Sequence, residues 1–136
     1  MALPNGAGGY QVGDGNLNEV QLGVQPAAQT ATATATLTTA QITGGILLGS
    51  PGSSAAAYTL PTGTSLDSAV PSAKVNSSFD FSVTNVDGSG SGVITMTAGT
   101  GWTIVGLATI AATAGTTGAF RARKTGDGTW VLYRLS

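Results

Sequence analysis

Closely spaced glycine-rich turns are the strongest constraint on the fold of this chain of 136 residues. After residue 30 the chain is interrupted by glycines at 44–45, 88–92, 99–101 and 126–128. Several segments between these turns alternate small or apolar residues with polar ones. Period-two alternation between glycine turns is typical of β-strands. The sequence therefore predicts a domain built from short strands.

About nine short strands follow from this pattern, with turns every 8–12 residues. They cover residues 30–38, 46–48, 56–60, 79–84, 93–97, 102–105, 107–113, 119–124 and 130–135. Residues 64–70 form the only predicted helix, capped by Thr64 with Asp67 as its capping-box partner. No repeat of 20–50 residues is visible, which speaks against a solenoid. The prediction is an all-β domain, a β-sandwich or jelly-roll-like fold or a small barrel, with one short helical turn.

Residues 1–30 have a different character and are predicted to be an extended N-terminal arm, with residues 31–136 as the β-rich knob. Glycines interrupt this segment, and single apolar side chains are spaced along it without a helical period. The best of these apolar side chains are Tyr10, Leu17, Val20 and Leu22. They suit an arm that lies across another protein surface, and the alternative is a partly disordered terminus.

The core of the knob is predicted to be thin, because more than half of the residues are Gly, Ala, Thr or Ser. Oligomerisation or docking on a larger body would supply the missing burial. Ala31, Ala33 and Ala35 form a strand face small enough for a second backbone to approach closely. Trp102 and Trp130 are expected in the core or at subunit contacts, and the alternative is a sugar-stacking platform. These five residues are the subunit-contact candidates.

The residue types that are missing exclude several classes of function. With no His and no Cys, the chain lacks the usual ligands of zinc, haem and iron–sulfur sites and the partners of a Ser-His-Asp or Cys-His nucleophile. A net charge of −1 gives no basic field for nucleic acid. No apolar run is long enough to span a membrane, and the first residues do not resemble a signal peptide. No cofactor, metal, nucleic acid or membrane partner is expected.

The remaining motifs are weak. The glycines of 88–92 lack the lysine of a phosphate-binding loop, and a calcium loop starting at Asp87 would have Ala98 at its last ligand position. A glycosidase-like pair of carboxylates meeting in space stays a remote alternative. Arg121, Arg123 and Lys124 are interpreted as a solvated strand face, or as partners of Asp80 or Asp127, rather than as an anion site. No catalytic residue is predicted.

Several stretches resemble capsid decoration, or cement, proteins of tailed bacteriophages. They are residues 1–24, 58–62, 99–106, 120–126 and 130–134. The resemblance implies a trimeric, β-rich virion protein on the outer surface of an icosahedral head. It also implies that the N-terminal arm clamps neighbouring subunits of the major capsid protein.

Together these observations predict a non-enzymatic structural protein of the virion that cements the capsid from outside. Tyr10, Leu17, Val20 and Leu22 are the predicted capsid-binding residues of the arm. The alternative is a receptor-binding or tail-fibre tip module that uses exposed aromatic side chains. A third, poorer interpretation is a small glycan-active enzyme.

Overall fold

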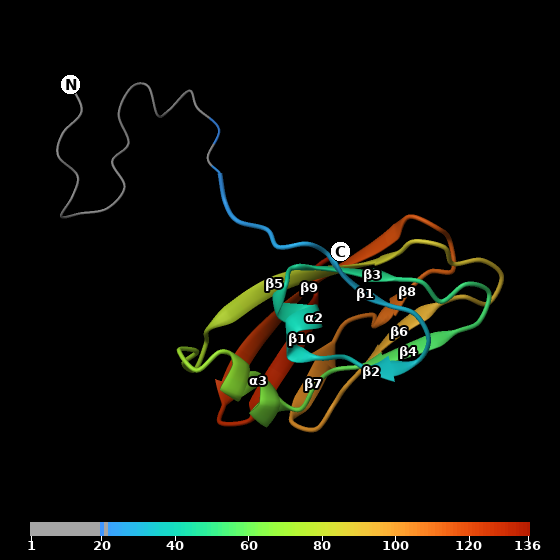
Figure 1. The fold of residues 1–136 in the computed structure, drawn as a ribbon. Helices are drawn as coiled ribbons and strands as arrows, with labels where there is room; N and C mark the ends of the chain where they lie inside the picture. Colours follow the sequence, from blue (N-terminus) through green and yellow to red (C-terminus); the bar gives the residue numbers. More distant parts are fainter. Residues whose placement is uncertain (1–19, 21) are drawn as a thin grey trace, which may run out of the picture.

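The computed structural model describes Val20 and residues 22–136, and this part of the chain is mostly β-strand, arranged in two sheets (Figure 1). The six-stranded sheet has the order β1 (Gln29–Ala31), β3 (Ile46–Gly49), β5 (Ser78–Asn85), β9 (Thr116–Gly126), β10 (Thr129–Arg134), β7 (Trp102–Val105). The four-stranded sheet has the order β2 (Ala35–Thr36), β4 (Ala56–Thr59), β6 (Ile94–Thr97), β8 (Thr109–Ile110). Two short helices, α2 (Thr39–Thr43) and α3 (Gly63–Ala69), lie between strands. The predicted β-rich character is confirmed.

The first six strands wind as a coil that alternates between the two sheets. β1, β3 and β5 run parallel in one sheet, and β2, β4 and β6 run parallel in the other. Gln29 of β1 pairs with Leu47 of β3, and Leu47 pairs in turn with Val83 of β5. The segment from Leu47 to Val83 is twice as long as the segment from Gln29 to Leu47, so the second winding of the coil is twice as long as the first. This unequal length explains why no repeat is visible in the sequence. Within the described residues neither sheet closes into a barrel, and both sheets are mixed.

The two sheets and both helices share one core. In β5, Phe81 and Val83 are buried while Asp80 faces solvent, as the alternation predicts. Phe81 lies opposite Phe120 of β9, and their rings stack at a centroid distance of 5.7 Å. Across the core, the Tyr58 hydroxyl of β4 donates to the Ala31 carbonyl of β1. Gly49 of β3 lies next to this hydroxyl: a Cβ atom there would be 3.0 Å from the Tyr58 hydroxyl oxygen, so a side chain has little room at this position.

The single strand predicted over residues 30–38 is wrong. The chain leaves the six-stranded sheet after Ala31 and enters the four-stranded sheet at β2. Thr38 then begins α2 as its N-cap: its hydroxyl accepts from the Gln41 N–H at 3.3 Å, and the Gln41 side chain accepts from the Thr38 N–H at 2.7 Å. This capping box, followed by the fully buried Ile42, turns the chain from extended backbone into a helix soon after β2.

The helix predicted over residues 64–70 exists, but its cap is different. α3 begins at Gly63, and the Thr62 hydroxyl, rather than that of Thr64, accepts from the Ser65 N–H. The prediction of a single helical turn is wrong because α2 is also present. Within the described part of the chain, neither helix has the length and apolarity needed to cross a membrane.

The hairpin predicted around 126–128 is confirmed, and it joins β9 to β10, its neighbour in the six-stranded sheet. β9 and β10 pair antiparallel across this turn. The strand predicted over 107–113 is reduced to β8. Leu107 lies outside it, and its carbonyl accepts from the Arg134 guanidinium instead.

Candidate functional site

The base of the N-terminal arm presents apolar side chains to solvent. Val20, Leu22 and Val24 are 80%, 88% and 98% exposed. Figure 1 shows this segment running away from the sheets, and its attachment point is the Gln25 side chain, which donates to the Gly44 carbonyl at 2.6 Å. Exposed apolar side chains at alternate positions of an extended segment are suited to contact with a second protein surface.

The predicted capsid-binding residues fall into two groups. Val20 and Leu22 are exposed on the arm, where the prediction requires them to be accessible. Tyr10 and Leu17 lie outside the described residues. β1 begins at Gln29 and so includes the last two residues of the predicted arm, residues 1–30. Regular structure therefore begins just before the predicted end of the arm.

The five subunit-contact candidates are placed differently from one another. Ala31 is buried in the core of this chain, whereas Ala33 and Ala35 are exposed. Trp102 and Trp130 are only 8% and 1% exposed, and their rings stack on each other at 5.9 Å. The two tryptophans therefore pack within the chain and do not form an exposed sugar-stacking platform.

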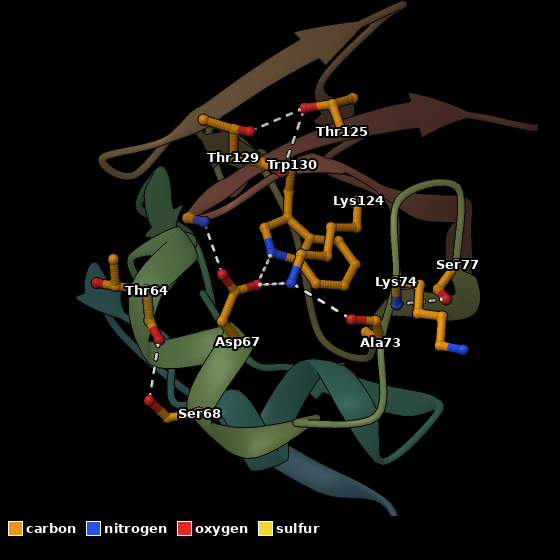
Figure 2. Close-up of polar contacts among 11 residues, drawn as sticks. Thr64, Asp67, Ser68, Ala73, Lys74, Ser77, Lys124, Thr125, Thr129 and Trp130 are labelled. Atoms are coloured by element: carbon orange, nitrogen blue, oxygen red, sulfur yellow. Dashed lines mark hydrogen bonds and ion pairs between the residues drawn. The ribbon is translucent and has the colours of Figure 1, made fainter.

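A charged cluster ties α3 to the β9–β10 hairpin, as Figure 2 shows. The Asp67 carboxylate accepts from the Gly128 N–H at 2.6 Å and from the Trp130 indole N–H at 3.0 Å. Its third partner is the Lys124 ammonium at 3.1 Å, which also donates to the Ala73 carbonyl. The expectation that Lys124 shares an outer face with the arginines of β9 is wrong, because alternation turns this residue inward.

The electrostatics of this cluster favour a charged carboxylate. The Gly128 N–H lowers the pKa of Asp67 below its ordinary value of 3.8, and hydrogen bonds from Lys124 and Trp130 act in the same direction, against the opposing effect of burial. Every oxygen of Asp67 is already hydrogen-bonded within the chain. The cluster is therefore arranged to hold elements together rather than to take up a ligand.

Arg121 and Arg123 lie on the outer face of β9. Arg121 pairs with Asp80 across the strands at 2.6 Å, so the expected partnership is confirmed for this residue. Hydrogen bonds from Arg121 lower the pKa of Asp80. Arg123 donates to the Tyr133 hydroxyl and to the Asn76 side chain. Both guanidinium groups are therefore engaged within the chain.

Carboxylates elsewhere have structural partners too. The Asp87 side chain accepts from the Gly52 N–H at 3.0 Å and so joins two loops. In the part of the chain that the structure describes, no three His, Cys, Asp or Glu side chains gather into a group that could hold a metal ion.

Three more exposed apolar side chains, which the sequence analysis missed, lie at or just beyond the ends of β7 and β10. Val105, Leu107 and Leu135 are 50%, 67% and 47% exposed. Val105 lies opposite Tyr133 in the parallel pair of β7 and β10. The available signal was the uncharged run of residues 102–108, but apolarity by itself does not distinguish a buried strand from an exposed edge.

Comparisons with protein-family models, with curated proteins and with solved structures find no match for this chain.

Proposed function

We propose that this protein is a non-enzymatic structural protein of a tailed bacteriophage, which decorates and cements the outer surface of an icosahedral head. Its partner is the major capsid protein, and it acts as a homo-oligomer, a trimer in this proposal. The resemblance of several sequence stretches to capsid decoration proteins supports this assignment. The observation that carries it is the arm, which leaves the sheets with exposed apolar side chains at alternate positions.

The physical basis of attachment is apolar burial rather than charge. Each arm residue among Tyr10, Leu17, Val20 and Leu22 contributes about 1.5–3 kcal/mol when it is fully buried in a neighbouring subunit, before the cost of ordering the arm. The arm has only two charged residues, Asp14 and Glu19, so binding should depend weakly on salt. Several arms on one oligomer bind with avidity even when each is weak.

The body that carries the arm is, in this proposal, a β-sandwich rather than a jelly roll. Jelly rolls are built from antiparallel Greek-key pairs. Here five of the eight strand pairs in the described residues are parallel. A body of two sheets that share one core is suited to bearing load between larger subunits.

The test is a binding experiment with phage heads that lack this protein. The full chain carrying Tyr10→Ser, Leu17→Ser, Val20→Ser and Leu22→Ser should lose head binding while its circular dichroism spectrum stays unchanged. A chain without residues 2–24 should behave in the same way. The matched control carries Val75→Ser and Val86→Ser, two exposed valines of the knob, and should bind normally.

Electron microscopy of complete particles gives the second readout. Density for this protein on the outside of the head is the expected result. Location on the tail would support the receptor-binding alternative and contradict the proposal. Full head binding by the four-site variant would show that attachment lies on the knob.

A further inference from the structure

We infer that Arg123, on the outer face of the six-stranded sheet, binds a carboxylate group of the neighbouring capsid protein, with Tyr133 and Asn76 as its positioning residues. This inference deepens the proposed function and rests on it, because it names the chemistry by which the knob contacts the major capsid protein. It revises the expectation from the sequence, which interpreted Arg123 as part of a solvated strand face rather than as an anion site.

The strand register places Arg123 in an outward-facing row of side chains. Ser78 of β5 lies opposite Arg123 on one side, and Val131 of β10 lies opposite it on the other. Val131 lies in turn opposite Thr103 of β7. Both neighbours of Arg123 in β9 are buried, so alternation directs the Arg123 side chain outward. Ser78 and Thr103 are exposed and Val131 is half-buried, so a partner can reach this row from solvent.

Two side chains from different parts of the chain hold the guanidinium group of Arg123. Its Nε donates to the Tyr133 hydroxyl at 3.0 Å, and its Nη1 donates to the side-chain oxygen of Asn76 at 2.8 Å. Its Cζ also lies 5.8 Å from the centre of the Tyr133 ring. A long side chain that is already held in one position loses less conformational freedom on binding. The guanidinium group is therefore preorganised to receive a partner.

The backbone of Asn76 is adapted to this contact. Its φ of 75° is the only positive value at a residue other than glycine in the described part of the chain. Asparagine tolerates this conformation better than most residues. The Asn76 N–H donates to the Lys124 carbonyl at 2.9 Å, which fixes the loop beside β9. The side-chain oxygen of Asn76 is therefore held within hydrogen-bond distance of Arg123.

The charge of Arg123 is not balanced by any carboxylate of the described residues. The ion pairs in that part of the chain join Arg121 to Asp80 and Lys124 to Asp67. The Nη2 atom of Arg123 also has no acceptor among the described residues. A guanidinium group with N–H groups to spare recognises a planar carboxylate through parallel, charge-assisted hydrogen bonds. Charge complementarity therefore points to a partner that presents a carboxylate.

The surroundings favour a protein carboxylate over the phosphates of a nucleic acid. The next outward residue of β9, Arg121, is neutralised by Asp80, so Arg123 does not belong to a row of unpaired cations along this strand. Nucleic acids are bound through several Lys and Arg contacts to phosphate. Tyr133 and Val131 instead offer half-buried apolar surface beside a single charge, and Tyr and Arg are enriched at the energetically important positions of protein interfaces. The occupant is therefore an acidic side chain on a protein surface.

The test measures how tightly the full chain binds phage heads that lack this protein. Arg123→Gln should lower the affinity by about tenfold to a hundredfold, the range expected when a hydrogen bond to a charged group is lost. Arg123→Lys should recover only part of this loss, because an ammonium group is a point charge without the planar fork of a guanidinium. Circular dichroism shows that each variant is folded.

Two matched controls separate the site from charge in general. Lys74→Gln removes one positive charge from an exposed side chain outside the strands, so it changes the net charge by the same amount as Arg123→Gln. The double variant Asp80→Asn with Arg121→Gln removes the neighbouring guanidinium group of the same face and leaves the net charge unchanged. Both controls should bind heads like the unchanged chain.

Tyr133→Phe and Asn76→Gly test the positioning residues. Each variant removes one acceptor from the Arg123 guanidinium, and glycine adopts the positive φ of Asn76 without strain. Each should lower the affinity for heads severalfold. Neither should weaken binding further in a chain that already carries Arg123→Gln, and a full additional loss in that background would contradict the positioning role.

The outcomes distinguish this inference from the proposed function. Binding by folded Arg123→Gln as tight as that of the unchanged chain, or an equal loss in Lys74→Gln, would overturn the inference and leave the proposed function standing. Dissociation of the oligomer by Arg123→Gln in sedimentation velocity would place the carboxylate on a second copy of the chain and overturn its assignment to the capsid protein. If the unchanged chain does not bind heads, the proposed function is wrong, and the inference falls with it.

Discussion

At the scale of single residues, the few buried polar side chains do the work of joining loops. Asn85 is fully buried, donates to the Gly92 and Ala111 carbonyls and accepts from the Gly88 N–H. In the described residues, every buried side-chain nitrogen and oxygen has a hydrogen-bond partner. Because a buried polar group without a partner is costly, each of these side chains specifies one arrangement of its loop.

Asp67→Asn should lower the free energy of unfolding by about 2–3 kcal/mol, because it leaves the nearly buried Lys124 ammonium without its anionic partner. Urea denaturation at neutral pH and a fixed protein concentration measures this. The matched control is Asp80→Asn, whose ion pair with Arg121 is about half exposed on both sides and should contribute much less to stability. Equal losses in the two variants would contradict the role given to burial.

Acid should weaken the same contact. The unfolded chain protonates Asp67 near its ordinary pKa of 3.8, whereas the folded chain does so at a lower pKa. The unfolded state therefore binds the proton first, so this part of the stability is present above about pH 5 and is lost as the pH falls through the folded pKa. Urea midpoints measured between pH 7 and pH 3 should fall less steeply for Asp67→Asn than for the unchanged chain. Parallel curves for the two proteins would argue against this source of acid sensitivity.

At the scale of elements, three segments meet at a junction of glycines. Gly63 begins α3, Gly101 precedes β7, and Gly128 lies in the β9–β10 turn. A Cβ atom on Gly63 would lie 2.0 Å from the Gly128 carbonyl oxygen, and one on Gly101 would lie 2.1 Å from it. The backbone of α3 at Gly63 therefore approaches the hairpin more closely than a residue with a side chain would allow. This close approach also brings Asp67 within hydrogen-bond distance of its partners in the hairpin.

Gly63→Ala should destabilise the fold by about 1–3 kcal/mol, because backbone atoms of the hairpin must move to admit a methyl group. Thermal or urea unfolding checks this result. Gly23→Ala is the control, since nothing lies within 4 Å of the added carbon and the residue belongs to the arm. A Gly63→Ala protein as stable as the control would mean that the junction adjusts without cost.

At the scale of the whole molecule, the small core and the exposed apolar side chains both favour association between copies of the chain. The core is shared by two sheets whose strands are short, and three of the four edge strands in the described residues have two or three residues. Such a body gains stability when copies associate, because assembly favours the folded state by mass action.

The unfolding temperature should therefore rise with protein concentration, by about 3 °C for each tenfold increase. Differential scanning calorimetry over a hundredfold range of concentration provides the measurement. Concentration-independent unfolding of the unchanged chain would contradict an assembled native state.

Local pattern was enough to predict most strands and their faces. Alternation placed Phe81 and Val83 inside and Asp80 outside, and the glycines around 126–128 predicted the hairpin, because side-chain direction in a strand and backbone conformation in a turn depend on adjacent residues. The arm was predicted from a local pattern too, its isolated apolar side chains, of which Val20 and Leu22 are exposed. The absence of His and Cys removed whole classes of chemistry before any fold was known.

Only the tertiary structure decided which strands pair and which surfaces remain uncovered. The coil of parallel strands depends on contacts between residues as distant as Leu47 and Val83, and no local signal encodes them. Trp130 and Val105 both belong to apolar segments that were predicted as strands, yet one lies in the core and the other at an exposed edge. The inward turn of Lys124 toward Asp67 likewise required α3 to be packed against β10. Burial is a property of the neighbours that folding brings together, so the sequence by itself determined most strands and turns, and the packing determined which apolar side chains stay exposed.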